Sequence, residues 1–321
     1  MVVTWYSEDT GLPACSLEAS GHTVTVGTYK LCPDNTRQGQ LLLYTLHHDP
    51  HHQLHCRRLD SQDCPGVLDI SWSSHSQPLL ASAESGGQLS LWSLSEDKTR
   101  LESRSQLTVT SGLCLAVEWS ADNSSLTVSD SEGGVSILSV REEEATVTTR
   151  IPAHSFEAWT TCFNKHNSSL VYSGGDDCVF KLHDLRQEHS VRSNSRSHSM
   201  GVTSMLADLR DQNKLWTGSY DEQLRLWDVR NCRQEVESLS VGGGVWRIKQ
   251  NLTNSTLLLA TMHDGFKTVR DMAVVEEYRE HESLAYGADW VVGLDSEEGK
   301  SRDIAATCSF YDHLLRVWSV S

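Results

Sequence analysis

The sequence predicts an all-β protein built as a seven-bladed β-propeller. Two landmarks recur along its 321 residues with one shared period. The first is a bulky side chain that ends an apolar strand, as at Trp72, Trp119 and Trp290, and the second lies in a later strand, as at Trp92 and Trp227. Both recur at intervals close to the roughly 40 to 45 residues of a four-stranded blade. Two independent landmarks with one period indicate seven copies of the same unit.

The clearest copy of the unit is residues 217–228, Thr-Gly-Ser-Tyr-Asp-Glu-Gln-Leu-Arg-Leu-Trp-Asp. It is typical of a strand, a tight polar turn and a second strand, and it ends in the Trp-Asp pair of WD repeats. The same alignment gives the Trp position of the seven blades to Tyr44, Trp92, Leu138, His183, Trp227, Arg270 and Trp318. We therefore expect one WD-repeat propeller domain over residues 1–321, with blade one at roughly 13–46.

Residues 1–12 fall outside the repeat pattern, and blade one has no obvious inner strand before Cys15. We expect the ring to close through the C-terminal segment Leu315–Trp318.

The sequence of blade five also predicts a chain of buried hydrogen bonds. His198 precedes the inner strand, Thr217 lies in the next strand, Asp221 is in the turn and Trp227 follows. An Asp that holds a His, which in turn holds a hydroxyl, would lock the blade edge. The set resembles a catalytic triad, but within a WD unit we interpret it as structural. In blade seven, Cys308 aligns with Thr217.

Composition excludes several classes of function. The formal net charge of −16 argues against nucleic acid, since a phosphate backbone requires a basic patch. The nine cysteines include no Cys-x-x-Cys pair, so neither a zinc ribbon nor a disulfide framework is expected. With no leader-like N-terminus and no apolar stretch of membrane-spanning length, we expect a cytoplasmic protein that does not enter a membrane. No cofactor is expected, and nothing in the sequence requires more than a monomer.

Two local segments have the composition of a binding site, one for a metal and one for a phosphate, but we interpret neither as such a site. The His-rich run 47–55 offers possible metal ligands, but it contains a proline and lacks ligand spacing, so we expect a solvated loop and no metal. The triplet Gly242–Gly244 lacks the Lys-Ser/Thr ending of a phosphate loop, and we expect it to allow close approach of the backbone to the ring axis.

Candidate functional residues gather at one face of the predicted ring. In a WD propeller, the residues before the inner strand and the turn after the second strand open onto the same face. Three aromatic residues, Trp159, Trp246 and Tyr286, take one repeat position, which Leu68 and Leu115 take in blades two and three. The face also collects Glu157, Gly201, Arg247, Asp176, Tyr220, His263 and Tyr311. An aromatic and acidic mouth would suit a quaternary ammonium ion, although each aromatic would equally serve packing between blades.

Several segments are more specific than a generic WD repeat. They are Ala153–Trp159, Val171–Asp177, His198–Val202, residues 217–228, Gly243–Lys249, Met262–Lys267, Tyr286–Trp290 and Ala306–His313. Together they resemble the WD-repeat diphthine methyl ester hydrolases, also called diphthine methyltransferases, of the diphthamide pathway. The resemblance covers the chain, most closely from about residue 150 onward. The first 14 residues depart from the family pattern, which places a Glu-Trp strand before the Cys-x-Leu-Glu segment.

The resemblance implies hydrolysis of the methyl ester of diphthine methyl ester on translation elongation factor 2, without a cofactor. The substrate joins a trimethylammonium group to a methyl ester, and its hydrolysis needs proton transfer and stabilisation of an oxyanion. By residue type, His263 would be the general base and Arg247 the oxyanion partner. Tyr311 is a weaker candidate, as is Cys308, which would act as the nucleophile only if its pKa were lowered. Glu157, Trp159, Asp176, Tyr220, Trp246 and Tyr286 would hold the substrate cation. The alternative is a non-catalytic adaptor that docks elongation factor 2 or other proteins of the pathway, since most propellers do no chemistry.

Overall fold

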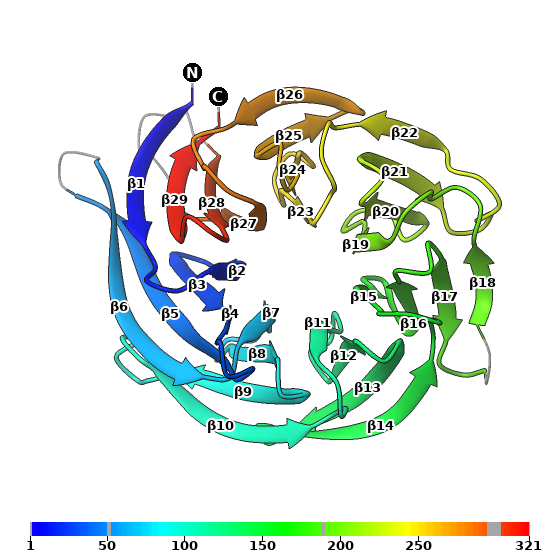
Figure 1. The fold of residues 1–321 in the computed structure, drawn as a ribbon, viewed down its shortest axis with the longest axis horizontal. Coiled ribbons are helices and arrows are strands. Elements are labelled where there is room, and N and C mark those ends of the chain that lie inside the picture. Colours follow the sequence, from blue (N-terminus) through cyan, green and yellow to red (C-terminus); the bar gives the residue numbers. More distant parts are fainter. Residues whose placement is uncertain (1, 50–52, 188–189, 294–302, 321) are drawn as a thin grey trace.

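The structure is a computed structural model that describes residues 2–49, 53–187, 190–293 and 303–320. Seven antiparallel sheets are arranged around a central opening, each with its first strand innermost, so the predicted seven-bladed propeller is confirmed (Figure 1). No helix in the described residues is long and apolar enough to cross a membrane.

The strands of the first four blades follow one another in chain order. Blade one holds β2 (Ala14–Ser20), β3 (Thr23–Thr28), β4 (Lys30–Leu31), β5 (Arg37–His48) and β6 (Leu54–Cys64). Blade two holds β7 (Val67–Trp72), β8 (Leu79–Glu84), β9 (Gln88–Leu94) and β10 (Leu101–Thr108). Blade three holds β11 (Cys114–Trp119), β12 (Ser125–Asp130), β13 (Gly134–Arg141) and β14 (Glu144–Pro152). Blade four holds β15 (Thr160–Asn164), β16 (Asn167–Gly174), β17 (Phe180–Asp184) and β18 (Ser190–Asn194).

The last three blades complete the ring, and blade seven takes its outer strand from the other end of the chain. Blade five holds β19 (Val202–Ala207), β20 (Lys214–Ser219), β21 (Gln223–Asp228) and β22 (Glu237–Ser240). Blade six holds β23 (Arg247–Gln250), β24 (Leu257–Ala260), β25 (Phe266–Arg270) and β26 (Ala273–Tyr278). Blade seven holds β27 (Ala285–Val291), β28 (Ile304–Ser309), β29 (Leu314–Ser319) and β1 (Val3–Asp9).

The ring closes by pairing the two ends of the chain. β1 lies antiparallel to β29, with Val3 opposite Ser319 and Asp9 opposite Leu314. Residues 3–9 therefore belong to blade seven, and the segment around Cys15 is itself the inner strand of blade one. Blade one reaches Cys64 rather than about residue 46, because β6 supplies its outer strand.

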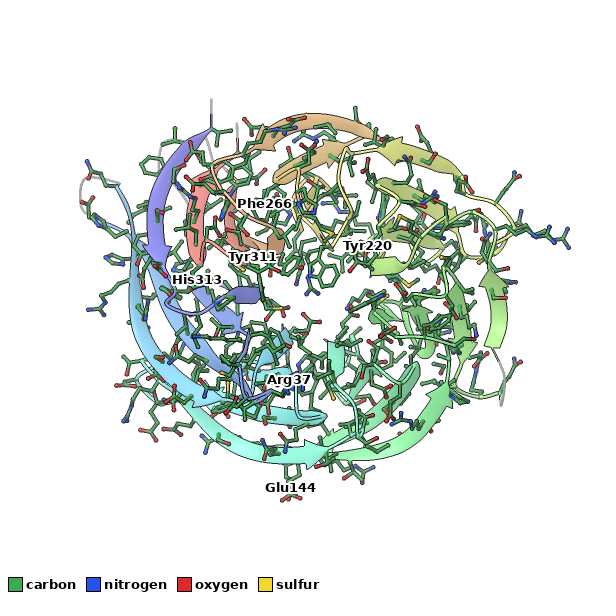
Figure 2. The ribbon with its side chains drawn as sticks, in the orientation of Figure 1. Arg37, Glu144, Tyr220, Phe266, Tyr311 and His313 are labelled. Atoms are coloured by element: carbon green, nitrogen blue, oxygen red, sulfur yellow. The ribbon has the colours of Figure 1, made fainter. Side chains whose placement is uncertain are left out.

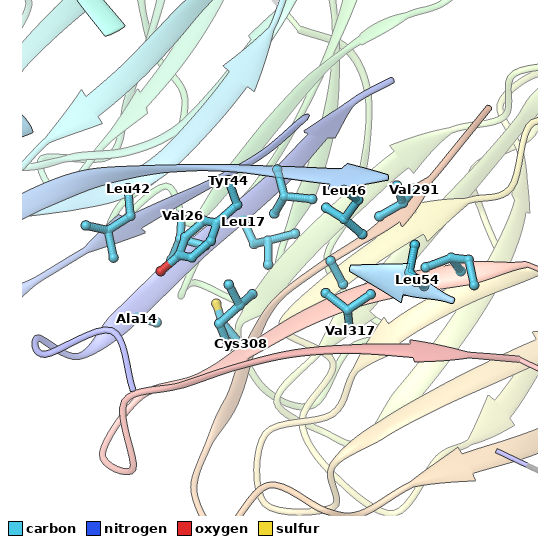
Figure 3. Packing of buried hydrophobic residues seen from close by; sticks show 14 residues of the cluster. Ala14, Leu17, Val26, Leu42, Tyr44, Leu46, Leu54, Val291, Cys308 and Val317 are labelled. Atoms are coloured by element: carbon cyan, nitrogen blue, oxygen red, sulfur yellow. The ribbon is translucent and has the colours of Figure 1, made fainter. Parts of the chain in front are cut away.

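The hydrophobic core is divided among the interfaces between blades. Seven clusters of buried side chains each join two neighbouring blades. Figure 3 shows the cluster at the closure, where Tyr44 and Leu46 of blade one pack with Val291 and Val317 of blade seven. Because no blade buries both of its faces alone, the stability of each blade depends on its two neighbours.

The Trp position is confirmed in six blades and corrected in blade six. In blade five, Trp227 pairs with Leu215 across β20 and β21. The equivalent partner of Leu257 in blade six is Val269, which is 1 % exposed, and not Arg270, which is exposed. Without a Trp, nothing in the local sequence of blade six fixes this register, and the predicted alignment is wrong by one residue.

The predicted hydrogen-bond chain of blade five is present except for its first link. His198 Nε2 lies 2.9 Å from Thr217 Oγ1, which also accepts the indole N–H of Trp227 at 2.9 Å. Asp221 pairs with Arg225 at 2.9 Å, and His198 Nδ1 has no partner among the described residues. The expected Asp–His link is therefore wrong in this blade, because a neighbouring arginine takes the carboxylate.

Blade four carries the complete chain, with a histidine in place of the Trp. Asp177 Oδ1 lies 2.9 Å from His154 Nδ1, and His154 Nε2 lies 2.9 Å from Ser173 Oγ. The hydroxyl then meets His183 Nε2 at 2.8 Å. These groups lie between strands of one blade, which supports the structural interpretation.

Blade seven corrects the alignment of Cys308. The indole of Trp318 donates to Thr307 Oγ1 at 3.1 Å, and His281 Nε2 lies 3.0 Å from the same oxygen. Thr307 is therefore the equivalent of Thr217, because the turn between β28 and β29 is one residue longer than the turn in blade five.

The buried histidines make the fold sensitive to acid. Burial lowers the pKa of His183 and His198 from 6.5 to about 4, and that of His281 to about 3. Between these values and 6.5 the unfolded chain binds protons that the folded protein does not, so the free energy of unfolding should fall as the pH drops from 6.5 towards 4. The slope should reach about 1.4 kcal/mol per pH unit for each histidine.

Urea denaturation at half-unit pH steps measures this dependence. The control variant His183→Trp gives blade four the residue found at position 227. In this variant the slope of the free energy of unfolding against pH should be smaller by the contribution of one histidine. Equal slopes in the two proteins between pH 6.5 and 5 would contradict the assignment.

The His-rich run is largely a hairpin and not a loop. His47 and His48 end β5, and His55 lies in β6 directly opposite His47, with the two rings stacked at 5.6 Å. Residues 50–52 lie outside the described residues. The alternation of polar and apolar side chains is weak here, so the extended hairpin is not visible in the sequence pattern.

Candidate functional site

One side chain per blade occupies the start of each inner strand. In five blades the residue is the extra member of a β-bulge, namely Cys15, Leu68, Leu115, Thr203 and Tyr286. The register of β15 and β23 gives the same position to Trp159 and Trp246. A β-bulge changes the direction of its side chains. The rings of Trp159 in blade four and Trp246 in blade six are in contact, although blade five lies between these two blades. The side chains of Trp159 and Trp246 therefore turn towards the ring axis.

Three aromatic rings form a mutual contact at this level. The ring centroids lie 5.7 Å apart for Trp159 and Trp246, 6.0 Å for Tyr220 and Trp246, and 6.4 Å for Trp159 and Tyr220. We call these three residues the aromatic triad. Gly201 and Gly244 allow it to form, because a Cβ on either glycine would come within 3.4 Å of Tyr220. Each of the three rings is only partly buried, so solvent reaches the triad.

A carboxylate completes the triad on its outer side. The indole N–H of Trp159 donates to Asp176 Oδ1 at 3.0 Å, and the N–H of Asp176 donates to the carbonyl of Glu157 at 2.9 Å. Burial raises the pKa of Tyr220 to about 12, and the charge of Asp176 adds to the shift. The triad therefore lies within the field of at least one negative charge.

Further aromatic rings extend the triad towards blade seven. Trp246 stacks on Tyr286 at 4.8 Å, Tyr286 contacts Phe310 at 5.4 Å, and Phe310 contacts Tyr311 at 5.0 Å. Tyr311 is 72 % exposed. Figure 2 shows Tyr220 and Tyr311 near the central opening. The sequence prediction missed Phe310, although it directly precedes Tyr311 in the lengthened turn.

His263 lies apart from the triad. It is exposed in the turn between β24 and β25, and it lines a hollow of about 720 Å³ together with Tyr311, His281 and Asp312. The register places Met262, and not His263, at the position of Tyr220. In the sequence, His263 directly precedes Asp264 as Tyr220 precedes Asp221, which suggests that the two are equivalent, and the one-residue shift of blade six makes this match wrong.

Arg247 spans the channel beneath the triad. Its Nη2 lies 2.8 Å from Oδ1 of Asp69, a residue that is 4 % exposed. Asp69 Oδ2 also accepts the N–H of Val117 at 3.0 Å. Asp69 and Arg247 hold the same register position in blades two and six, so their ion pair connects opposite sides of the ring.

A second ionic group lies one step further along the inner strands. Lys249 Nζ lies 3.6 Å from both Glu18 and Asp289. Burial raises the pKa of Glu18, against the opposing effect of Lys249. A cavity of about 580 Å³, lined by both ionic groups, continues to the ends of the inner strands, where Trp72 and Trp290 lie. The channel therefore changes from aromatic at one face to charged in its middle.

Cys308 is unsuited to a nucleophilic role. Its side chain is fully buried, and burial raises its pKa well above the ordinary value. It lies against the backbone of Gly287, where a Cβ would come within 2.5 Å of its sulfur. The sequence candidate is wrong at this position, because Cys308 packs between blades one and seven. In the described residues, no three potential metal ligands lie together.

The structure thus brings together most of the predicted substrate residues. Glu157, Trp159, Asp176, Tyr220, Trp246 and Tyr286 form one continuous group, and Tyr311 joins it through Phe310. Arg247 lies below this group and His263 beside it. The sequence prediction missed Asp69, although a charged residue inside the apolar strand 67–72 was a visible signal.

Comparison with known proteins finds relatives over most of the chain. The diphthine methyltransferase of Mus musculus is 35 % identical, over 86 % of this chain and 66 % of its own length. That of Homo sapiens is 33 % identical, over 86 % and 71 %, and that of Schizosaccharomyces pombe is 30 % identical, over 92 % and 90 %. No protein-family model matches the chain.

Solved structures show the same fold. The WD40 β-propeller domain of Doa1 covers the whole chain with a TM-score of 0.76 at 12 % identity. At this identity the likeness concerns the fold alone.

Proposed function

Because this chain belongs to the diphthine methyltransferase family, we propose that it hydrolyses the methyl ester of diphthine methyl ester on translation elongation factor 2. The products are methanol and the diphthine carboxylate that is amidated in the last step to diphthamide. Water is the only co-reactant, so the proposed enzyme is a cofactor-independent carboxylic ester hydrolase. It acts in the cytoplasm as a monomer.

The observation that carries the proposal is the aromatic triad with Asp176 at its edge. A quaternary ammonium has no N–H to donate, so a site holds it by aromatic faces and by negative charge. Trp159, Tyr220 and Trp246 supply three rings from three consecutive blades, and Asp176 supplies the charge. Glu157 and Tyr286 extend the same surface. This matches the trimethylammonium group of the proposed substrate.

The chemical step needs a base for water and a donor for the oxyanion. In our proposal water adds to the ester carbonyl carbon and Arg247 hydrogen-bonds the resulting oxyanion. His263, which lines a separate hollow, accepts the proton of that water through intervening water molecules. When the intermediate collapses, the C–O bond to methoxide breaks, and the departing oxygen takes the proton as methanol. Tyr311 shares the hollow with His263 and would orient the protein part of the substrate at this edge of the site.

The rim around the triad fits a protein substrate. Three large apolar side chains on this face are exposed, with Phe156 at 61 %, Met200 at 52 % and Tyr311 at 72 %. Phe156 lies three residues before Trp159 in the same loop. Met200 lies close to Tyr220, because its carbonyl accepts a hydrogen bond from the hydroxyl of Ser219, the residue before Tyr220. Exposed apolar side chains that cluster on one face mark interaction sites. We propose that they dock elongation factor 2 around its modified histidine.

Intact-mass analysis of elongation factor 2 bearing diphthine methyl ester tests the function. Incubation with the purified protein alone should remove about 14 Da at the modified histidine and release methanol, as expected for ester hydrolysis. Binding of elongation factor 2 with an unchanged mass would replace the esterase with the adaptor function.

The variant His263→Ala tests the proposed base in the same assay. Its turnover should fall at least about a hundredfold, the low end of what general-base catalysis contributes. His166→Ala is the matched control, because His166 is also exposed but lies in the turn after β15, at the other end of an inner strand. Full activity of His263→Ala would remove His263 from the mechanism.

A further inference from the structure

The ion pair between Arg247 and Asp69 leaves part of the guanidinium available. A guanidinium carries five N–H donors, and Asp69 engages it through Nη2. Arg247 Nε is buried and has no acceptor among the described residues. The side chain as a whole is 20 % exposed, so it still meets the channel. This Nε is itself buried, and the same atom of Arg225 and Arg316 also lacks a partner in the described part of the chain, so the donors open to a ligand in the channel are the other N–H groups that Asp69 does not engage.

Asp69 is itself fixed on two sides. One carboxylate oxygen pairs with Arg247, and the other accepts the N–H of Val117 from the next blade. Three neighbouring carboxylates bind the next blade in the same way: Glu18 accepts from Trp72, Glu118 from Phe163, and Asp289 from Ala19. Asp69 differs because its partner cation comes from the opposite side of the ring.

The charges along the channel have an order that suits a two-ended ligand. The triad and Asp176 attract a cation at the mouth. Arg247, which follows Trp246 in the chain, presents N–H donors one layer deeper, where Asp69 offsets its charge. The deeper Lys249 lies between Glu18 and Asp289, which offset its charge. A ligand with a trimethylammonium group next to a carbonyl or carboxylate would thus place its oxygens at Arg247.

We propose that Asp69 is a positioning residue that holds Arg247 across the channel, so that its remaining N–H groups bind the ester carbonyl and then the product carboxylate. This inference rests on the proposed function and deepens it, since it names what recognises the acyl end of the substrate. The triad holds the cationic end, and the cross-channel ion pair fixes how far into the channel the other end reaches.

Two small ligands test separately the binding of the cationic end and of the acyl end of the substrate. Tetramethylammonium carries the cation alone, and glycine betaine carries the same cation with a carboxylate. Ligand-observed NMR of the methyl protons measures the affinity of each. The native protein should bind betaine about tenfold more tightly than tetramethylammonium, as expected for a charge-assisted hydrogen bond. Asp69→Asn and Arg247→Gln should lose this preference while their affinity for tetramethylammonium stays within about threefold.

Glu118→Gln is the matched control. Glu118 also binds the next blade through a backbone N–H, but its cation is Lys165, so the variant should keep the betaine preference. Asn at position 69 can still accept the N–H of Val117. If Asp69→Asn nevertheless unfolds, Arg247→Lys keeps the charge without the planar fork and should show the same loss.

Kinetics on the protein substrate give a second readout. Asp69→Asn should lower kcat about thirtyfold with KM within about threefold of the native value, and Asp69→Glu should recover part of the loss. A native protein that hydrolyses the ester but binds betaine no better than tetramethylammonium would overturn this inference and leave the proposed function standing. A native protein that neither hydrolyses the ester nor binds tetramethylammonium would overturn both.

Discussion

Replacing Trp246 by alanine is expected to raise KM for the modified elongation factor about thirtyfold, which corresponds to about 2 kcal/mol of cation–π attraction in a desolvated site. Trp246 is the central ring of the face, since it contacts Trp159, Tyr220 and Tyr286. Its removal takes one wall from the triad and also frees the other three rings. Steady-state hydrolysis at a series of substrate concentrations measures the effect.

The equivalent position in blade two provides the control. Leu68 occupies the equivalent position on the aliphatic side of the ring, so Leu68→Ala should leave KM within about twofold because no cation–π contact is lost. Trp246→Phe should recover about half of the lost free energy, since phenylalanine has a weaker ring quadrupole. An equal rise in KM for Leu68→Ala and Trp246→Ala would show that packing, and not cation binding, explains the result.

Deleting residues 1–9 is expected to lower Tm by roughly 10 °C. The deletion removes the fourth strand of blade seven and its hydrogen bonds to β29, at about 1 kcal/mol each. It also uncovers the side chain of Trp318, which is fully buried and faces Thr4 across the sheet. The exposed edge of β29 should cause self-association, because an unpaired strand is a template for pairing. Thermal unfolding and light scattering measure the two effects.

A peptide of residues 1–12 added to the truncated protein should restore most of the lost stability, because the groove beside β29 is otherwise intact. As a control, Trp5→Ser in the full chain changes a 38 % exposed side chain of β1 and should leave Tm within about 2 °C. A truncated protein with unchanged Tm would show that β1 does not hold the ring closed.

The sequence predicts the fold well wherever a large residue marks the register. Trp92, Trp227 and Trp318 all lie at the predicted place, because an indole needs a deep site between blades and few positions provide one. The prediction fails by one residue at Val269 and again at Thr307. A valine is common at any strand position, and a lengthened turn leaves no signal in the spacing of apolar residues.

The candidate site likewise contains residues that the sequence predicts and residues that it does not. The aromatic residues at its mouth are predictable, because Trp159, Trp246 and Tyr286 stand out at one repeat position. Asp69 is not predictable as their neighbour, since its partner Arg247 comes from a blade across the ring. Repeat alignment shows which residues are equivalent, but only the closed ring determines which equivalent residues meet.

The pairing of β1 with β29 also has a consequence for the order of events during synthesis. Ribosomes make the N-terminal strand first, yet its partner consists of residues 314–319. Blades one to six can assemble locally as they emerge, since each contains consecutive strands, but blade seven must wait for a contact between distant parts of the chain. Until then the nascent ring exposes two unpaired edges, so we expect this stage to be the one most dependent on chaperones.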